Sequence, residues 1–419
     1  MSEVVKKPLR IALIGNVCNN MYNIGIALKK YTDIQPHLYL DNHLDIHSTP
    51  LYNDPDSVNQ SDWVFQDAKW DPTIYYKNLN KTFINKLIAE KYDAIIVSSA
   101  GVWLAPHVRN TKFLHWTTGG DITKVPFPRA FSFSYKGFLA KAKAFYMGAI
   151  HRRGMRNIDK FLSHPFSPNY LALSRLKIPD NKIADLYFPI IINTDIFKYN
   201  AEYESKISNE NLSKIKKFSF RIFHPSRLMI QQKKAFVEAG QWKGNEMLLK
   251  GLRAFIDKYG MNDICIMLPN RVYSVDKDMF DKEIERLKLE ENIVWLNGKT
   301  NEGFNKEEMV ALYSASDLVV DEFGVGWFGS IVVEGTACSK PTMCYIDEIG
   351  MKKMYPWHPV ISTDTPEGIA EEIAKLYFDK AYTKQKGEES RRWAVEFHSH
   401  ENAGKIYAEQ IQKIVIEIQ

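Results

Sequence analysis

The sequence predicts an α/β protein built from two Rossmann-like doubly wound domains that face a cleft. Short apolar runs alternate with amphipathic helical patterns through most of the 419 residues. The apolar runs have no polar face, which is typical of parallel strands covered by helices on both sides. The alternation restarts near residue 219, after a hydrophilic stretch, and this restart predicts a second domain. The length also suits two or three domains of about 150 residues each.

The elements follow from these runs in chain order. The strands predicted in the first half are Arg10–Ile14, Ala94–Ser98, Phe113–Thr117 and Leu186–Ile191. Those predicted in the second half are Phe220–His224, Ile264–Leu268, Ile293–Leu296, Leu318–Asp321 and Thr342–Ile346. The predicted helices are Asn23–Lys30, Asn169–Leu176, Asn245–Lys258, Lys277–Leu287, Lys306–Ser314, Ser330–Cys338, Glu367–Phe378 and Asn402–Ile418.

Domain boundaries are expected where this pattern is interrupted. The lysine-rich stretch Glu202–Lys217 precedes the restart, and a hinge is predicted near Asn193–Tyr199. We therefore expect an N-terminal domain over 1–198 and a C-terminal domain over 199–400. The last helix, over 401–419, is expected to pack back on the N-terminal domain.

Composition limits the classes of function. Hydrophobic residues make up 45% and charged residues 25%, as in ordinary globular proteins, and the net charge of +5 implies neither nucleic acid nor membrane by itself. The four cysteines form no CxxC pair, so free thiols in a reducing compartment are expected and zinc or iron–sulfur sites are not. No apolar run approaches the ~18 residues of a membrane span, and no secretory signal is recognised, so a cytoplasmic protein is expected.

A glycine-rich loop between a strand and a helix is the most informative motif. Gly324, Gly326 and Gly329 precede a helix that is expected to begin at Ser330. Glycines allow a backbone to approach a ligand closely, and the free N–H groups of a helix N-terminus suit a diphosphate. Glu334 lies one turn into this helix, where a carboxylate can accept hydrogen bonds from ribose hydroxyls. The alternative is an ordinary strand–helix turn with a solvated Glu334.

This stretch resembles the donor signature of retaining GT-B glycosyltransferases of the family-4 type (glycosyl transferases group 1). That signature has two glutamates separated by seven residues, followed by a helix of small residues and Gly/Ser-Lys-Pro. Here Glu334 matches the second glutamate, but Gly326 stands at the position of the first. Asp321 or Glu322 is expected to hold the hydroxyls of the transferred sugar instead.

Two cations belong to the same resemblance. Arg227 ends the segment Phe223-His-Pro-Ser-Arg, and Lys243 precedes a predicted helix in Trp-Lys-Gly-Asn. The resemblance implies that both bind the donor diphosphate, where fixed cations stabilise the charge that develops on the leaving group. The alternative is two solvated surface cations.

The first domain carries weaker signals. Gly15 and Asn16 follow the first strand and resemble the family loop that approaches the sugar and phosphate, and Asn20 is predicted to cap the next helix. A plain turn and cap is an equal alternative. Asp121, after two glycines, matches a family aspartate near the sugar or acceptor, whereas His115 is expected to be a packed core residue.

A basic and aromatic region spans Phe127 to Phe161. Its cations include Lys141, Lys143, Arg152, Arg153 and Arg156, against the single acid Asp159. Basic segments with interleaved aromatics suit anionic membrane surfaces, and family members meet lipid-linked acceptors in this region. A solvated helix face with buried aromatics is the alternative, and no nucleic-acid module accompanies the region.

The resemblance implies retaining transfer of a hexosyl group from a nucleotide-sugar to a glycan or lipid-linked acceptor, without cofactor or metal. Asp54-Pro-Asp56 has the letters of a metal motif but lies in a polar loop. A nucleotide-sugar epimerase of the same fold and a noncatalytic scaffold at a membrane surface are the alternatives. The expected location is the cytoplasm, peripheral to a membrane.

Overall fold

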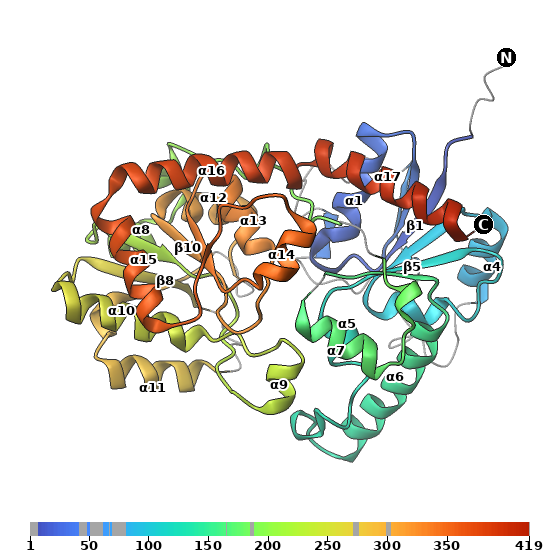
Figure 1. Cartoon of the computed structure of the whole chain (residues 1–419), viewed down its shortest axis with the longest axis horizontal. Helices are drawn as coiled ribbons and strands as arrows, with labels where there is room; N and C mark the ends of the chain where they lie inside the picture. The colour runs from blue at the N-terminus through green and yellow to red at the C-terminus, as the bar shows by residue number, and fades with distance from the viewer. Residues whose placement is uncertain are drawn as a thin grey trace. The chain divides into compact units, whose positions relative to one another are not determined.

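The computed structural model describes residues 7–41, 48–50, 62–66, 68, 81–164, 166–184, 188–270, 276–298 and 303–418. The chain divides into two compact units, one of Met1–Ile191 with His400–Gln419 and one of Ile192–Ser399 (Figure 1). The first change of unit thus falls at 191/192, whereas the sequence placed the boundary at 198/199. Asp54-Pro-Asp56 lies outside the described residues.

Unit 1 contains a six-stranded parallel sheet with the order β3-β2-β1-β4-β5-β6. Its strands are β1 (Arg10–Ile14), β2 (Gln35–Tyr39), β3 (Val64–Phe65), β4 (Ala94–Val97), β5 (Lys112–Trp116) and β6 (Lys160–Leu162). Its α-helices are α1 (Asn20–Tyr31), α4 (Lys81–Glu90), α5 (Gly120–Thr123), α6 (Phe138–Arg156), α7 (Ser167–Arg175) and α17 (His400–Ile418). Short 3-10 turns are η1 (Val17–Asn19), η4 (Ser99–Leu104), η5 (Ser132–Ser134) and η6 (Asp180–Lys182).

Unit 2 contains a second six-stranded parallel sheet with the order β12-β11-β10-β7-β8-β9. Its strands are β7 (Phe220–Phe223), β8 (Ile264–Pro269), β9 (Ile293–Leu296), β10 (Leu318–Val320), β11 (Thr342–Cys344) and β12 (Ile361–Ser362). Its α-helices are α8 (Asn209–Ile215), α9 (Lys234–Glu238), α10 (Asn245–Tyr259), α11 (Lys277–Leu287), α12 (Lys306–Ala315), α13 (Ser330–Ala337), α14 (Glu348–Met354), α15 (Pro366–Phe378) and α16 (Lys380–His398). Its 3-10 turns are η7 (Tyr203–Lys206) and η8 (Glu290–Asn292).

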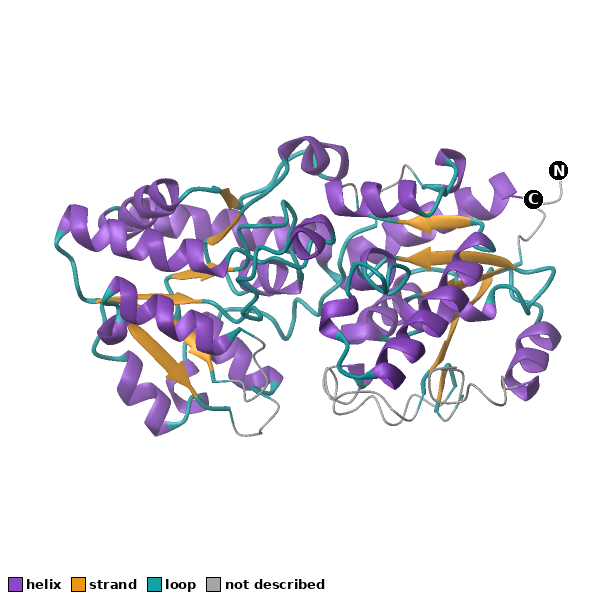
Figure 2. Ribbon diagram, turned by 90° about the horizontal axis from the view of Figure 1, so that it is seen from below, coloured by secondary structure: helices purple, strands orange, loops and turns teal. Residues whose placement is uncertain are grey.

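The two sheets have the same topology. When the strands of unit 2 are renumbered from its first strand, both sheets read 3-2-1-4-5-6, the order of a Rossmann fold. Helices lie on both faces of each sheet (Figure 2). The sequence-based prediction of two doubly wound domains is confirmed.

Alternation along β1 explains how the sheet of unit 1 is covered on both sides. Ile11 and Leu13 belong to a core shared with α1 and α17, whereas Ala12 and Ile14 belong to a core shared with α4, α6 and α7. Because successive strand residues point to opposite faces, a strand that is buried on both faces shows no alternation of polar and apolar residues. This is the physical origin of the continuous apolar runs in the sequence.

The last helix, α17, packs on α1 within unit 1. A Cβ atom on Gly404 would lie 2.8 Å from the Ala27 carbonyl oxygen, so the two backbones approach closely. The buried Tyr407 hydroxyl accepts a hydrogen bond from Trp116 Nε1 (2.8 Å) and donates one to the Pro189 carbonyl (3.0 Å). One tyrosine therefore joins α17 to β5 and to the chain that leaves unit 1.

The strand predicted over Leu186–Ile191 is not formed in its described part. Residues 188–191 are buried but pair with no strand, since Pro189 lacks an N–H group. Side chains bind the backbone instead, as Asn23 Nδ2 donates to the Ile191 carbonyl (3.1 Å). The sequence also missed β2, β3, β6 and β12, which are short or contain polar residues and proline.

Candidate functional site

The strand order locates the places where ligands bind in folds of this kind. Ligands of doubly wound sheets lie beyond the carboxyl ends of the strands, where the order reverses. That reversal falls between β1 and β4 in unit 1, and between β7 and β10 in unit 2. The candidate residues near Gly15, Arg227 and Gly329 follow β1, β7 and β10, so they all lie at these two switch points.

The loop after β7 is held by a buried histidine. His224 Nδ1 lies 3.0 Å from the Val320 carbonyl, and His224 Nε2 lies 2.8 Å from Asn245 Nδ2. A carbonyl only accepts, so Nδ1 carries the proton and Nε2 accepts from the amide. The Asn245 oxygen in turn accepts from the Met229 N–H (2.7 Å), which fixes both ends of the loop that carries Arg227.

Asp321, at the end of β10, joins the two loops of the unit 2 switch point. One carboxylate oxygen accepts a hydrogen bond from the Ser226 hydroxyl, and the other accepts from the Gly329 N–H (3.1 Å). Asp321 is buried and caps the N-terminus of α13, where a negative charge is stabilising. Both carboxylate oxygens of Asp321 are therefore engaged within the protein.

The two predicted diphosphate-binding cations lie close together but differ in their environment. Lys243 forms an ion pair with the buried carboxylate of Glu322. Arg227 is exposed and has no ion-pair partner among the residues that the structure describes. Burial lowers the pKa of Lys243, and the neighbouring charge of Arg227 adds to this effect, whereas Asp321 opposes it. The site therefore holds one available cation and one that a carboxylate already neutralises.

The three glycines of the donor loop do not share one role. A Cβ atom on Gly324 would lie 2.5 Å from the Trp242 carbonyl oxygen. Gly326 has φ +79, and its Cβ would lie 3.2 Å from the Tyr345 ring, so a glutamate at this position would be strained. Only Gly329 faces open space, apart from the carboxylate of Asp321 at 3.5 Å. Gly324 and Gly326 thus lie close to the protein's own chain on the side where a Cβ would stand, and the role of the three glycines in approaching a ligand stays a prediction.

Glu334 is linked to a second helix. Its carboxylate accepts a hydrogen bond from the Tyr313 hydroxyl of α12 (2.8 Å). Burial raises the pKa of Glu334 to about 7, although the Tyr313 hydrogen bond and Lys306 act in the opposite direction. The predicted ribose acceptor thus titrates near neutral pH. Ser330, at the start of the same helix, is partly exposed.

The first switch point, in unit 1, is closed by backbone contacts. Gly15 has φ +92, its carbonyl accepts from the Ser98 hydroxyl, and a Cβ on Gly15 would lie 2.4 Å from the Ser98 carbonyl oxygen. Asn16 is buried, and its amide binds the Asn19 side chain and the Ser48 carbonyl. Its oxygen accepts from the Tyr22 N–H (2.9 Å), so Asn16 satisfies a free N–H group of α1.

The capping prediction for Asn20 is wrong. Asn20 is the first residue of α1, and Asn19 precedes it at the N-cap without a side-chain capping bond. Asn16 reaches the helix end because η1 turns the chain back between β1 and α1.

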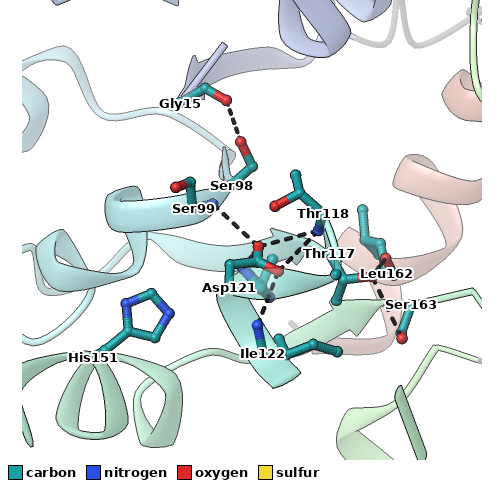
Figure 3. A network of polar contacts seen from close by, with 12 residues as sticks. Gly15, Ser98, Ser99, Thr117, Thr118, Asp121, Ile122, His151, Leu162 and Ser163 are labelled. Atoms are coloured by element: carbon teal, nitrogen blue, oxygen red, sulfur yellow. Dashed lines mark hydrogen bonds and ion pairs between the residues drawn. The ribbon is translucent and has the colours of Figure 1, made fainter. Parts of the chain in front are cut away.

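Asp121 lies in a buried network of unit 1 (Figure 3). Its carboxylate accepts hydrogen bonds from the N–H groups of Ser99 (3.2 Å), Thr118 (3.0 Å) and Ile122 (2.9 Å). His115 Nε2 lies 3.0 Å from the same carboxylate. Burial alone would raise the pKa of Asp121, but the attraction of His115 and the Thr118 hydrogen bond lower it. Asp121 therefore positions the loop after β5, and His115 is a core residue as expected.

The five candidate cations of the first unit lie on α6. Lys141, Lys143, Arg153 and Arg156 are exposed, and Arg152 donates to the Pro126 carbonyl. The aromatic side chains of this region differ in exposure, since Phe131 is buried, whereas Phe133, Phe138, Phe145 and Tyr146 are exposed.

Sequence reasoning missed three contributors to the unit 2 switch point. Ser226 and His224 stand within the segment from which only Arg227 is predicted to bind a ligand, and no role at the site is predicted for Tyr313. The signal for His224 and Ser226 was their place directly after a strand, where side chains reach the switch point. Nothing in the sequence pairs Tyr313 with Glu334, since 21 positions separate them.

No group of three or more His, Cys, Asp or Glu side chains within the described residues is arranged to hold a metal ion. Within the same residues, no helix combines the length and apolarity needed to span a membrane.

Solved structures of similar fold match nearly the whole chain. HepE from Anabaena, in complex with UDP and glucose, has a TM-score of 0.62 at 16% identity, covering 96% of this chain and 99% of its own. A glycosyltransferase from Rickettsia africae ESF-5 has a TM-score of 0.60 at 15% identity, with 97% and 99% covered. UDP-GlcNAc 2-epimerase from Neisseria meningitidis, bound to UDP-GlcNAc, has a TM-score of 0.51 at 12% identity, with 97% and 100% covered.

The fold is GT-B. Two sheets of identical strand order and these matches along nearly the full length establish it. No protein-family model matches the chain, and no curated protein matches it by sequence. The GT-B identity therefore rests on structure, and the activity is a matter for proposal.

Proposed function

We propose that the chain is a retaining glycosyltransferase that moves a hexosyl group from a nucleotide-sugar to an acceptor hydroxyl. The observation that carries the proposal is the unit 2 switch point, where the N-terminus of α13 lies with Arg227 and Lys243. Helix N–H groups and cations together suit a diphosphate. HepE was solved with UDP and glucose, which supports a uridine nucleotide-sugar as the first donor to examine.

The proposed donor complex exchanges one ion pair for another. The incoming diphosphate takes Lys243 from Glu322 and recruits Arg227, which has no ion-pair partner among the described residues. Glu322, at the end of β10, then accepts hydrogen bonds from the hydroxyls of the sugar, in place of the glutamate missing at Gly326. Glu334 accepts from the ribose. The exchange replaces the cation beside Glu322 with hydroxyl donors, so the buried carboxylate keeps hydrogen-bond partners when Lys243 turns to the diphosphate.

The proposed reaction uses no protein nucleophile and no metal. The acceptor hydroxyl attacks the anomeric carbon on the face from which the diphosphate departs, and a phosphate oxygen takes the hydroxyl proton. The bond from the anomeric carbon to the diphosphate oxygen breaks, and the nucleoside diphosphate leaves. Arg227 and Lys243 stabilise the charge on the leaving oxygen, an effect worth about 3–4 kcal/mol for one well-placed donor. We propose a glycan or lipid-linked precursor as acceptor, presented at an anionic membrane surface.

Incubation with a panel of radiolabelled nucleotide-sugars and membrane extracts tests the proposal. Release of the nucleoside diphosphate with transfer of label to an acceptor is the expected result. Conversion of the free nucleotide-sugar without an acceptor would assign the chain as an epimerase, the reaction of the similar Neisseria meningitidis protein. Absence of nucleotide binding in a thermal-shift panel would contradict both and favour a noncatalytic scaffold.

A further inference from the structure

The first half of α6 is exposed to solvent on its apolar side. Phe138 is 83% exposed and Leu139 is 82% exposed, the highest values among the large hydrophobic side chains of the described residues. Phe145 (44%) and Tyr146 (49%) are exposed one to two turns further on. Figure 1 shows α6 as the teal helix at the lower right. Burying such side chains in an apolar medium is favourable, so this surface is suited to a partner.

These side chains form one stripe with cations on both borders. Residues three, four, seven and eight apart share a helix face, so Phe138 aligns with Phe145, and Leu139 aligns with Tyr146. Lys141 lies on one border of the stripe and Lys143 lies on the other, as the 3.6-residue period requires. Lysines at such borders bury their methylene stems beside apolar groups and keep the ammonium in water.

The second half of α6 is fixed to the body of unit 1. Gly154 lies so close to η4 that a Cβ atom would be 2.4 Å from the Val102 carbonyl oxygen. The buried His151 accepts a hydrogen bond at Nδ1 from Trp103 Nε1 (3.1 Å). The stripe over Phe138–Tyr146 is therefore presented on a rigid stem rather than on a loose segment.

We propose that the first half of α6 inserts Phe138 and Leu139 into the interface of an anionic lipid bilayer. The helix carries five cations and no acid over Phe138–Arg156, so its charge complements an anionic leaflet. The same charge opposes a second copy of this helix, because like charges would face each other. An interfacial helix needs an apolar face and flanking cations, and it needs no span of the membrane. This inference assigns to α6 the membrane contact that the proposed function requires, but its test measures vesicle binding and does not depend on glycosyl transfer.

Cosedimentation of the full chain with lipid vesicles tests the inference. Vesicles of phosphatidylglycerol mixed with phosphatidylcholine are compared with vesicles of phosphatidylcholine alone. Phe138→Ser with Leu139→Ser is expected to weaken partitioning to anionic vesicles by tenfold or more, and Ile349→Ser, which removes an equally exposed apolar side chain of α14 (76%), is expected to leave it unchanged. Lys141→Gln with Lys143→Gln should cost about fivefold for each cation, on anionic vesicles only.

All these side chains are exposed, so the variants are expected to keep the circular dichroism spectrum and melting temperature of the parent chain. Equal partitioning of the Phe138/Leu139 variant and the parent chain would overturn the inference. So would a concentration-dependent dimer that this variant abolishes, since the stripe would then serve a second copy. Loss of RNA binding in the lysine variant, without any change on vesicles, would assign the cations to nucleic acid.

Discussion

The two switch points have the same strand order but are completed in different ways. In unit 1, the Ser98 hydroxyl donates to the Gly15 carbonyl, and the Asn16 amide oxygen and the Asp121 carboxylate accept from backbone N–H groups. In unit 2, one side chain, Asp321, joins the loops, and Arg227 is left without an ionic partner among the described residues. The same topology thus carries loops in unit 1 whose polar groups bind one another, and loops in unit 2 that leave the Arg227 side chain exposed. The chemistry depends on the loops and not on the sheet.

The largest expected effect is on the available cation. Arg227→Ala is expected to reduce turnover by about 100-fold to 1,000-fold, because one charge-stabilising donor is lost from the leaving group. Release of nucleoside diphosphate at saturating nucleotide-sugar measures the effect. Arg286→Ala removes an exposed arginine of α11 and is the matched control. Unchanged turnover in the Arg227 variant would remove this residue from the site and weaken the contrast between the units.

Replacing glycines of unit 1 with alanine is expected to have the next largest effect, a loss of unfolding free energy. Gly15→Ala and Gly119→Ala both place a Cβ at nearly the same φ, +92 and +91, but nothing lies within 4 Å of the Gly119 Cβ position. We expect a loss of about 1–2 kcal/mol in unfolding free energy at Gly119 from the backbone alone. The loss at Gly15 should be larger by about 1–3 kcal/mol, because the neighbouring backbone must move.

Urea unfolding of both glycine variants measures this difference. Equal losses would mean that Ser98 yields without cost, and the unit 1 loops would then be less closely packed than the contacts indicate.

The Tyr313–Glu334 pair is expected to make nucleotide affinity at the unit 2 switch point depend on pH. The pKa of Glu334 is raised to about 7, so the folded carboxyl is neutral below that value and charged above it. We expect nucleotide affinity to rise between about pH 6 and about pH 8, as the carboxylate forms. Tyr313→Phe removes a hydrogen bond to the carboxylate, so the midpoint should move to higher pH and affinity at neutral pH should fall by about 10-fold.

Calorimetric titration with UDP across this pH range measures the midpoint. Tyr377→Phe, which removes a hydrogen bond to Asp263 in the same unit, is the control. The stability of the fold should show the opposite trend. A raised carboxyl pKa stabilises the folded state below the ordinary value of 4.5, and this contribution is lost as the pH rises towards about 7. A midpoint that stays in place in the Tyr313 variant would exclude Tyr313 as the group that sets it.

The smallest expected effect concerns the bridge between the unit 2 loops. Ser226→Ala removes one hydrogen bond to Asp321 and should cost about 1 kcal/mol, or a melting temperature lower by about 2–4 °C. Differential scanning calorimetry measures the change, with Ser205→Ala, an exposed serine of η7, as control. A loss no greater than that of the control would mean that Asp321 holds Gly329 without help from Ser226.

Much of the fold follows from local patterns. The helix over Lys277–Leu287 and the strand over Ile293–Leu296 have the predicted bounds, because apolar period and flanking polar residues are local properties. Strands such as β2 and β12 escaped prediction, since their pairing depends on neighbours elsewhere in the chain. The extended segment that ends at Ile191 was predicted as a strand, but Pro189 and side-chain hydrogen bonds decide otherwise.

The sequence by itself determined the class of the fold and the chemical groups available at the switch points, because both are written in local periodicity and in the residues that follow strands. Only the tertiary structure decided which of these groups form hydrogen bonds or ion pairs within the protein. Asp321 binds Ser226 and Gly329, Lys243 pairs with Glu322, and Tyr313 reaches Glu334 across two helices. Most of these pairings join positions far apart in the chain, and their strength depends on burial, which no local pattern specifies.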